Sequence, residues 1–398
     1  MRKPSTFRAA TIARSTATTV KGATVFIDTV LLKVASRCNL DCSYCYVYNM
    51  GDEAWRAMPK RMSPATEDAV AGGLGALLRS QAREFSVVLH GGEPLLLGSK
   101  RLAALLSKLR AELGRGCGIS IQTNGALITP AILDVCAEHQ VTLSVSIDGP
   151  ASVHDRFRVD RLGKATHAAV EAGIRTLQAH PDGAHLFSGV LAVIDPETVP
   201  EVLYDYFKAM GVPSADFLYR DGNHSVLPFG KACAASAEYG AWMSRILDRY
   251  VADPSPLRIR MLDDMMKLAL GGVGVKEGVG LTDYGILIID TDGSVKKNDT
   301  LKSSPLGDGF DEAWNVHHDA LQEIAVSPAF SAYHVAQRPT SKQCADCSVL
   351  NICGGGMLTH RFREGTGYDN PTVFCADQTL LIGRIQQHIE RYLSAEAA

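Results

Sequence analysis

The sequence lacks any run of about 18 uncharged apolar residues, the minimum for a helix that crosses a membrane. It also lacks a strong charge of either sign, because 40 Lys and Arg residues against 43 Asp and Glu residues give a net charge of −3. A balance this close to neutral provides no general attraction to nucleic acid or to an anionic membrane. With 46% hydrophobic and 21% charged residues, the chain is predicted to be a globular protein without nucleic-acid or membrane partners.

Residues 1–24 contain no acidic residue. They also lack the continuous apolar core of a secretory signal, which excludes that kind of leader. Their basic residues stand among many Ser, Thr and Ala residues, a composition found in organellar transit peptides and in disordered tails alike. We expect a flexible basic tail, with a targeting peptide as the alternative.

The ten cysteines are spread unevenly along the chain. Three lie within 38–45 and four within 344–375, whereas Cys117, Cys136 and Cys233 are isolated. Two clusters this far apart in a long chain are more typical of metal ligation than of a disulfide framework. The sequence therefore predicts metal centres in a reducing, cytoplasmic environment.

Between residues 28 and 220, short apolar segments alternate with helical ones. Six such units with short connections predict a parallel sheet covered by helices, and curling them gives a partial (β/α)6 TIM-like barrel of the α/β class. In such barrels the functional residues lie at the C-terminal ends of the strands. The predicted strands are 29–34, 85–90, 118–122, 141–147, 187–194 and 215–219. The helices predicted between them are 63–79, 100–113, one from about 129, 164–179 and 198–210.

The pattern changes after residue 231, and a length of 398 residues allows two or three domains. Two amphipathic helices and a Gly-rich hinge come first, and Asp292-Gly293 then predicts the turn of a β-hairpin over 285–298. We expect helices at 311–326 and 377–393. The expected divisions are a flexible tail (1–24), a barrel (25–231), a helical linker (232–274) and a small cysteine-rich domain (275–398).

Cys38, Cys42 and Cys45 follow the first predicted strand, so one loop can place three thiols around one centre. A structural zinc site is normally closed by four ligands, whereas three suit a cubane iron–sulfur cluster whose fourth iron stays open. The CX3CX2C spacing, with Tyr44 before the last Cys, resembles the signature of the radical S-adenosylmethionine (radical SAM) enzymes. The resemblance implies a [4Fe–4S] cluster that binds S-adenosylmethionine (SAM). A zinc knuckle and a disulfide-linked loop are the alternatives.

Further residues at predicted strand ends agree with this resemblance. Gly91-Gly92-Glu93-Pro94 resembles the family's GGEP segment, in which glycines let the backbone approach the methionine amino group and Glu93 anchors that group or supports the loop. Taken singly, each of these residues is ordinary in a turn or a surface ion pair. The residues for which the resemblance implies contact with SAM are Tyr44, Gly91, Gly92, Glu93, Asn124, Ser146, Asp148, Arg158 and Ala192.

The second cysteine cluster resembles the SPASM extension of peptide-modifying radical SAM enzymes, which in full binds two auxiliary cubanes. Its members here are Cys344, Cys347, Cys353 and Cys375. Three positions that serve the first auxiliary cluster in that family carry no cysteine, at about Thr282 and at Asn298 and Met357. The resemblance therefore implies one auxiliary [4Fe–4S] cluster on the four remaining cysteines. A structural zinc in the same thiolates is the alternative.

Asp299 adjoins one of these missing cysteine positions. In the sulfatase-maturating relatives that the pattern resembles, an acid at the matching position takes a proton from the substrate. Loss of a proton and an electron completes an oxidation once a hydrogen atom has been abstracted. The resemblance implies this catalytic role for Asp299, with a turn residue that caps the hairpin as the alternative.

The segments 37–55, 219–224 and 352–375 resemble the maturases that build cyclophane crosslinks in ribosomally made peptides. Arg220, Asp221 and His224 follow the sixth strand, where a substrate would enter. We expect them to orient a peptide backbone, with a loop network as the alternative. No folded leader-binding domain is evident, so we expect a peptide to add as a strand to the hairpin edge.

The sequence therefore predicts a radical SAM enzyme that oxidises a peptide side chain, most specifically by an aromatic-to-aliphatic Cβ crosslink. Its implied partners are a precursor peptide and a one-electron reductant of the flavodoxin or ferredoxin type. The alternatives are formylglycine formation in a sulfatase, thioether formation, dehydrogenation of a small alcohol, or a non-catalytic zinc-binding module.

Overall fold

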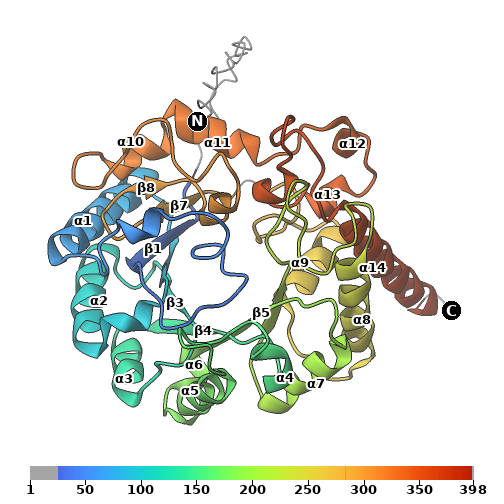
Figure 1. Ribbon diagram of the computed structural model, residues 1–398, viewed down its shortest axis with the longest axis horizontal. Coiled ribbons are helices and arrows are strands. Elements are labelled where there is room, and N and C mark those ends of the chain that lie inside the picture. Colours follow the sequence, from blue (N-terminus) through green and yellow to red (C-terminus); the bar gives the residue numbers. More distant parts are fainter. Residues whose placement is uncertain (1–25, 283, 397–398) are drawn as a thin grey trace, which may run out of the picture.

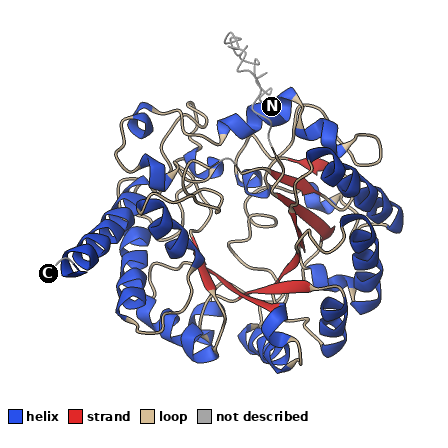
Figure 2. Ribbon diagram, turned by 180° about the vertical axis from the view of Figure 1, so that it is seen from behind, coloured by secondary structure: helices blue, strands red, loops and turns tan. Residues whose placement is uncertain are grey.

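The computed structural model describes residues 26–282 and 284–396, and the tail predicted over 1–24 lies outside the described residues. One eight-stranded sheet curls into an arc with helices on its outer side (Figure 1, Figure 2). Its strands are β1 (Thr29–Ala35), β2 (Ser86–Gly91), β3 (Ile119–Thr123), β4 (Val141–Ser146), β5 (Phe187–Val193), β6 (Ala215–Leu218), β7 (Ile286–Ile289) and β8 (Val295–Lys296). Their order is β6-β5-β4-β3-β2-β1-β7-β8, with every pair parallel except β7–β8. This arrangement confirms the predicted α/β partial barrel.

Helices follow the strands and cover the outer side of the arc (Figure 2). The first, α1 (Pro64–Gln81), begins where predicted, because the Ser63 side chain accepts a hydrogen bond from the Thr66 amide and a proline occupies the first turn. Its side chains Leu74 and Leu77 are buried in the core, which stabilises the fold by roughly 1.5–3 kcal/mol each. The next helices are α2 (Ser99–Leu113), α3 (Pro130–Glu138), α4 (Ala151–His154), α5 (His167–Ala179), α6 (Gly183–Leu186) and α7 (Pro200–Met210).

The hairpin predicted over 285–298 belongs to the barrel sheet rather than to a separate domain. β7 runs parallel to β1, with Thr29 opposite Ile286 and Leu32 opposite Ile289. All four residues of β7 are buried, because an unbroken run of Ile and Leu packs on both faces as a central parallel strand does. The expected cysteine-rich domain over 275–398 therefore includes two strands, β7 and β8, that belong to the barrel sheet.

The helix predicted over 311–326 is wrong for most of that range. The chain there runs along the outer edge of β8, where the Val295 amide donates to the Trp314 carbonyl. Helical backbone is confined to α10 (Leu321–Ala325), followed by α11 (Pro328–Ala336). The same segment covers part of the edge to which a peptide strand was expected to add.

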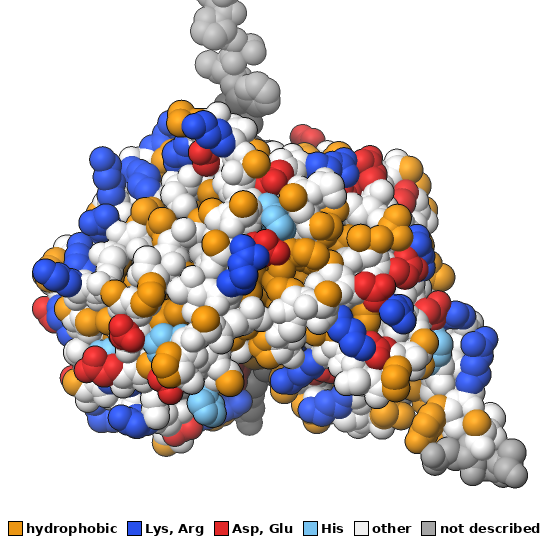
Figure 3. Space-filling model, turned by 90° about the horizontal axis from the view of Figure 1, so that it is seen from below, with side chains coloured by type: hydrophobic (Ala, Val, Ile, Leu, Met, Phe, Trp, Pro, Cys, Tyr) orange, Lys and Arg blue, Asp and Glu red, His pale blue; other side chains and the backbone are white. Residues whose placement is uncertain are grey.

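The C-terminal part closes one side of the arc (Figure 1). An ion pair between Arg384 and Asp248, at 2.8 Å, joins its last helix to the helix that follows the barrel. Figure 3 shows this last helix projecting from a face on which hydrophobic and charged side chains are mixed. No helix in the described ranges is both long and apolar enough to span a bilayer. The helices of this part are α8 (Glu238–Ala252), α9 (Arg260–Ala269), α12 (Lys342–Ala345), α13 (Leu350–Cys353) and α14 (Cys375–Glu396).

Candidate active site

The C-terminal ends of the barrel strands meet around a cavity of about 240 Å³, the place where barrels of this type carry their functional residues. The loop that follows β1 curls into the space inside the arc (Figure 1) and forms one wall. The predicted site residues that line the cavity are Cys38, Cys42, Tyr44, Cys45, Gly91, Gly92, Asn124, Ser146, Arg158, Arg220 and Asp221. Those that lie outside its wall are Glu93, Asp148, Ala192, His224 and Asp299.

The three thiols of the first cluster are held by a loop that is fastened to the chain after β4. The Asp41 amide donates to the Val159 carbonyl at 2.8 Å. Burial raises the pKa of the Cys38 thiol to about 12 and that of Cys45 to about 11. The thiols therefore stay protonated at neutral pH until a metal displaces their protons.

Gly91 and Gly92 form a shelf beside the thiol loop on which no side chain fits. A Cβ on Gly91 would lie 2.0 Å from the Ala35 carbonyl oxygen, and one on Gly92 would lie 2.4 Å from the Arg37 carbonyl oxygen. Gly91 also has a φ of +131°, which favours glycine. Bare backbone therefore borders the cavity next to the thiols, at the place where the resemblance implies close approach by SAM.

Glu93 supports the loop and does not face the cavity. Its carboxyl is fully buried and accepts hydrogen bonds from the Thr123 hydroxyl (2.7 Å) and from the amides of Leu95 (2.9 Å) and Asn124 (2.8 Å). Burial raises the pKa of Glu93 to about 7, although these donors oppose the shift. Glu93 thus ties the end of β2 to the end of β3, the second of the two roles that the resemblance implies.

Asp148 is a buried acceptor behind the cavity wall. It accepts hydrogen bonds from the Tyr44 hydroxyl (2.6 Å), Arg158 Nε (3.1 Å) and the Val193 amide (3.0 Å). Although burial opposes it, the Asp148 carboxylate raises the pKa of Arg158 above its ordinary value. Asp148 therefore fixes two side chains that do line the cavity, and Arg158 Nη1 lies 4.0 Å from Cys42 Sγ.

Asn124 and Ser146 continue the polar wall from the thiols toward β4. Asn124 Nδ2 donates to Asn39 Oδ1 at 2.8 Å and lies 3.7 Å from Cys38 Sγ. Ser146 Oγ accepts from Gln122 Nε2 at 2.9 Å. Hydroxyl and carboxamide groups in this position can meet ribose hydroxyls or a carboxylate.

Ala192 differs from the other predicted contacts because its side chain faces away from the cavity. Side chains alternate along a strand, and its neighbours Leu191 and Val193 line the wall. Ala192 itself is fully buried in the core. Because side chains alternate along β5, the cavity wall is formed by Leu191 and Val193 rather than by Ala192.

Asp299 lies in a buried cluster of charges. It pairs with Lys33 and lies 4.0 Å from Lys302, and these side chains are each 4% exposed. Although burial raises it, the two lysines hold the pKa of Asp299 below its ordinary value. Burial raises the pKa of Tyr46, which lines the cavity, and the neighbouring Asp299 carboxylate raises it further. Asp299 therefore lies close behind the cavity wall without lining the cavity itself.

His90 connects this charge cluster to the cavity, and the sequence analysis missed it. It lines the cavity just before the glycine shelf and interacts electrostatically with Asp299 and Lys33. Burial lowers the pKa of His90 to about 4, so the imidazole is neutral at pH 7. Its buried Nδ1 has no hydrogen-bond partner among the described residues. The available signal was a His that immediately precedes the GGEP-like segment at a strand end.

The three residues predicted to orient a peptide are separated in the structure. Arg220 and Asp221 line the cavity. His224 instead joins the barrel to the C-terminal part, because its Nε2 donates to the Pro371 carbonyl (2.8 Å) and its Nδ1 accepts from Arg363 (3.1 Å). The structure therefore corrects the role expected for His224 to a bridge between two parts of the chain.

The four cysteines of the second cluster come together from the region of α12 to the start of α14. The other three thiols all act electrostatically on Cys353, and burial raises its pKa to about 12. At neither cluster do three His, Cys, Asp or Glu side chains of the described residues converge closely enough to hold a single metal ion.

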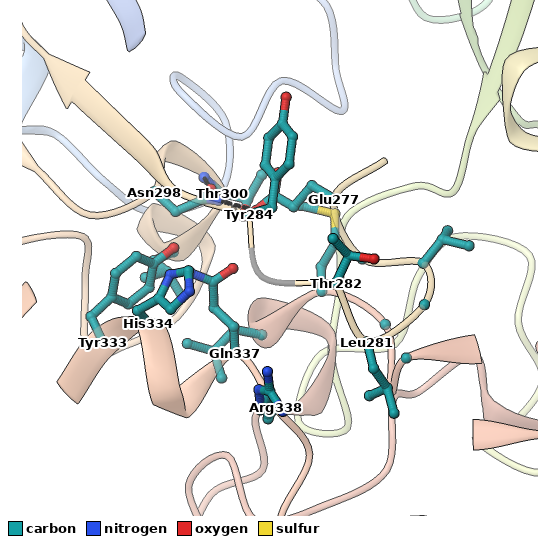
Figure 4. Close-up of a pocket in the computed structure, with 18 residues that line it drawn as sticks. Glu277, Leu281, Thr282, Tyr284, Asn298, Thr300, Tyr333, His334, Gln337 and Arg338 are labelled. Carbon is teal, nitrogen blue, oxygen red and sulfur yellow. Dashed lines mark hydrogen bonds between the residues drawn. The ribbon is translucent and has the colours of Figure 1, made fainter. Parts of the chain in front are cut away.

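The three positions that lack cysteine line one pocket (Figure 4). Thr282, Asn298 and Met357 meet there with Glu277. Asn298 Nδ2 donates to the Glu277 carboxyl at 2.6 Å, and burial raises the pKa of Glu277 to about 7. Hydroxyl, carboxamide and thioether groups thus stand where the full SPASM pattern has thiolates.

The cavity at the C-terminal ends of the strands fits a [4Fe–4S] cluster with bound SAM, the group that the loop of Cys38, Cys42 and Cys45 implies. Three thiols face it, a shelf of bare backbone borders them, and polar side chains continue the wall. Cys38, Cys42 and Cys45 would hold a [4Fe–4S] cluster with one iron open to the cavity. The polar wall would hold the amino-acid and ribose parts of SAM.

Residues 32–201 match the Radical SAM superfamily. The chain is 23% identical over 346 residues to the cysteine-type anaerobic sulfatase-maturating enzyme of Clostridium perfringens (strain 13 / Type A), which covers 82% of this chain and 88% of the relative. Its fold is similar to that of native anSMEcpe with bound AdoMet, with a TM-score of 0.78 and 20% identity over 92% of this chain and 99% of that one. It is also similar to Streptococcus suis SuiB bound to precursor peptide SuiA, with a TM-score of 0.59 and 14% identity over 88% and 76% of the two chains.

The matched residues run from β1 into α7 and contain the thiol loop, the glycine shelf and Asp148. The similarity of fold extends over the C-terminal part as well. Residues 32–201 are therefore the part of the chain that is similar to the radical SAM superfamily.

Proposed function

We propose that this enzyme oxidises a side chain of a ribosomally made peptide, and that the specific reaction is an aromatic-to-aliphatic Cβ crosslink. The observation that carries the proposal is one cavity whose wall combines the three thiols and glycine shelf with His90, Arg220 and Asp221. The first set suits a radical-generating cofactor and the second set suits a polar substrate. A fold shared with SuiB, solved with its precursor peptide, supports a peptide as that substrate.

When bound, the [4Fe–4S] cluster and SAM supply a 5′-deoxyadenosyl radical that removes a hydrogen atom from carbon. Completing the oxidation also releases a proton. His90 lines the cavity, is neutral at pH 7, and its Nδ1 has no hydrogen-bond partner among the described residues, so we propose that it accepts this proton. The Asp299 carboxylate raises the proton affinity of His90 electrostatically, so we propose that Asp299 acts through His90.

We propose that Cys344, Cys347, Cys353 and Cys375 hold one auxiliary [4Fe–4S] cluster, and that a flavodoxin or ferredoxin delivers electrons. The mutual approach of the four thiols supports this assignment. Residues at the three positions without cysteine support the loss of a further cluster, because a hydrogen-bonded carboxamide and carboxyl occupy their pocket. Zinc and iron analysis of the purified protein separates this assignment from a structural zinc site.

The test is co-expression with the product of a short neighbouring reading frame that ends in an aromatic-rich core. We expect the peptide to lose two hydrogens, with no backbone fragmentation between the two linked residues in tandem mass spectrometry. An unchanged peptide mass beside an enzyme that cleaves SAM would contradict the proposed reaction.

A second candidate is oxidation of Cys or Ser to formylglycine, which the named activity of the Clostridium perfringens relative favours. The pocket at Thr282, Asn298 and Met357 weighs against it, because the full extension expected of such relatives has cysteines there. Incubation with a sulfatase-derived peptide, followed by capture of aldehydes with a hydrazide, tests this candidate. Hydrazide-reactive product would establish it in place of the crosslink.

A further inference from the structure

Three arginines lie against the rings of Phe157 and Tyr44, and two of them have a carboxylate partner. Arg156 pairs with Asp195, and Arg158 pairs with Asp148 at 3.1 Å. Arg220, which lines the cavity, has no Asp or Glu oxygen of the described residues within 4.0 Å of its nitrogens. Among these three arginines, Arg220 is therefore the one without a carboxylate partner among the described residues.

Arg220 lies among aromatic rings instead. Its guanidinium carbon is 4.4 Å from the ring centroid of Phe157, 4.7 Å from that of Phe229 and 5.0 Å from that of Tyr44. Such contacts stabilise a cation by about 0.5–2 kcal/mol, but they use none of its N–H donors. Because the residue is only 9% exposed, those donors are also largely removed from bulk water.

A buried guanidinium without an anion is unfavourable, since desolvation is offset only by pairing and hydrogen bonding. Burial accordingly lowers the pKa of Arg220, although the group remains charged at neutral pH. The planar fork of N–H groups matches a carboxylate. Phe229, whose ring lies 4.7 Å from this guanidinium, is itself 38% exposed, so an apolar ring leads from the surface to the cation.

We propose that Arg220 receives a carboxylate of the substrate, so that the peptide carries an Asp or Glu side chain close to the residue that is modified. This inference rests on the proposed peptide oxidation and names a feature of its substrate. SAM has a carboxylate too, but polar groups nearer the thiols serve that end of the cavity, with Arg158 Nη1 only 4.0 Å from Cys42 Sγ. Arg220 follows β6 and lies against Phe229, a ring that reaches the surface.

The test uses the reconstituted full-length enzyme and a randomised library of short peptides with blocked ends, each containing one aromatic residue. Products are recognised by the loss of two hydrogens. We expect them to be enriched about tenfold or more in Asp or Glu at one fixed position, because losing a buried charge partner is costly. Arg220→Gln should abolish this enrichment, Arg220→Glu should replace it by enrichment in Lys or Arg, and Arg220→Lys should restore part of it.

Arg156→Gln is the matched control, because it removes a paired arginine that is 40% exposed. Arg156 contacts the same Phe157 ring as Arg220 but does not line the cavity, so the variant should keep the acidic preference. Since the preference is measured within the products of each variant, a variant with less folded protein still gives an answer.

Products without an acidic preference, or the same preference in Arg220→Gln, would overturn the inference and leave the proposed function intact. A higher KM for SAM in Arg220→Gln, with the peptide preference unchanged, would assign Arg220 to the cofactor and overturn it as well. A library that stays unmodified while the wild-type enzyme cleaves SAM would instead contradict the proposed peptide oxidation itself.

Discussion

The two cysteine clusters differ in how they present their thiols. The first offers three thiols on the wall of a cavity of about 240 Å³. The second gathers four, and the nearest titrating neighbours that act on Cys353 are the other thiols themselves. Three thiolates leave one iron of a cubane free for a ligand, whereas four leave none. We propose from this comparison that the first cluster carries out the small-molecule chemistry and that the second is a closed centre.

A third region, the pocket at Thr282, Asn298 and Met357, differs from both cysteine clusters. The pocket at Thr282, Asn298 and Met357 has the position expected for another cluster but none of the thiols. A buried carboxyl, Glu277, is hydrogen-bonded there to Asn298. A hydrogen-bonded carboxamide and carboxyl therefore occupy this pocket.

Exchanging single thiols should have the largest effect. Cys42→Ser is expected to abolish SAM cleavage, because two thiolates cannot hold the open cluster. Cys347→Ser should abolish the peptide product while SAM cleavage remains measurable. The readouts are 5′-deoxyadenosine by chromatography and peptide mass on the same samples. Loss of SAM cleavage in both variants would remove the proposed division of labour.

Removing the buried carboxylate near the cavity should have the next largest effect. Asp299→Asn removes the nearest carboxylate from Lys33, which keeps only Asp290 at 3.6 Å. Because breaking a buried pair costs about 3–5 kcal/mol and a second carboxylate remains, the fold should be destabilised by up to that amount, measured by urea unfolding. The exposed Asp68→Asn, which removes only a surface pair with Lys108, should change stability by less than about 1 kcal/mol.

The effect of Asp299 also has a defined pH dependence. Its pKa is lower in the folded chain than in the unfolded one, so its contribution is present above the unfolded value of about 3.9 and is lost as pH falls through the folded value. The difference between wild type and Asp299→Asn should therefore shrink in acid. A difference that persists unchanged there would show that charge is not the cause.

Glycines at the two regions should have similar effects on stability but different effects on function. A Cβ would lie 2.4 Å from a backbone oxygen at Gly92 and 2.0 Å from one at Gly354. Each Ala variant should lose about 1–3 kcal/mol, and only Gly92→Ala should weaken SAM binding. Gly72→Ala, where a Cβ meets nothing within 4 Å, is the control. Equal SAM affinity in the Gly92 and Gly354 variants would contradict the glycine shelf.

The bridge between the two regions should have the smallest effect. His224→Ala removes hydrogen bonds to the Pro371 carbonyl and from Arg363, which should lower the free energy of unfolding by about 1 kcal/mol. Burial lowers the pKa of His224, so this contribution is present above about pH 6.5 and falls as the solution becomes more acidic. If His224→Ala were as stable as the wild type at pH 8, the hydrogen bonds of His224 would not stabilise the contact between the barrel and the C-terminal part.

Much of the barrel could be predicted because its signals are local. The thiol loop, the glycines at 91–92 and Asp148 each follow a strand directly in sequence, and parallel strands bring their C-terminal ends to one edge. The alternation of side chains along a strand would likewise have predicted Leu191 and Val193, rather than Ala192, as residues of the cavity wall. These features can be predicted without knowing which distant parts of the chain come into contact.

The remaining features depend on contacts between distant residues. Lys33 and Asp299 are separated by 266 positions and meet because β7 pairs with β1. No local pattern shows which strand a hairpin will join. The prediction of a helix over 311–326 was wrong for a related reason, since backbone hydrogen bonds tie Trp314 to Val295 and Val316 to Gly293. The rings around Arg220 likewise come from three separate loops.

The most direct test of the division between the clusters is iron and sulfide analysis after anaerobic reconstitution. Wild-type protein should bind about eight iron and eight sulfide per chain. A variant with Cys38, Cys42 and Cys45 all changed to Ala should keep about four of each and lose SAM cleavage. Zinc without iron at the second cluster, or no loss of iron in this variant, would contradict the account.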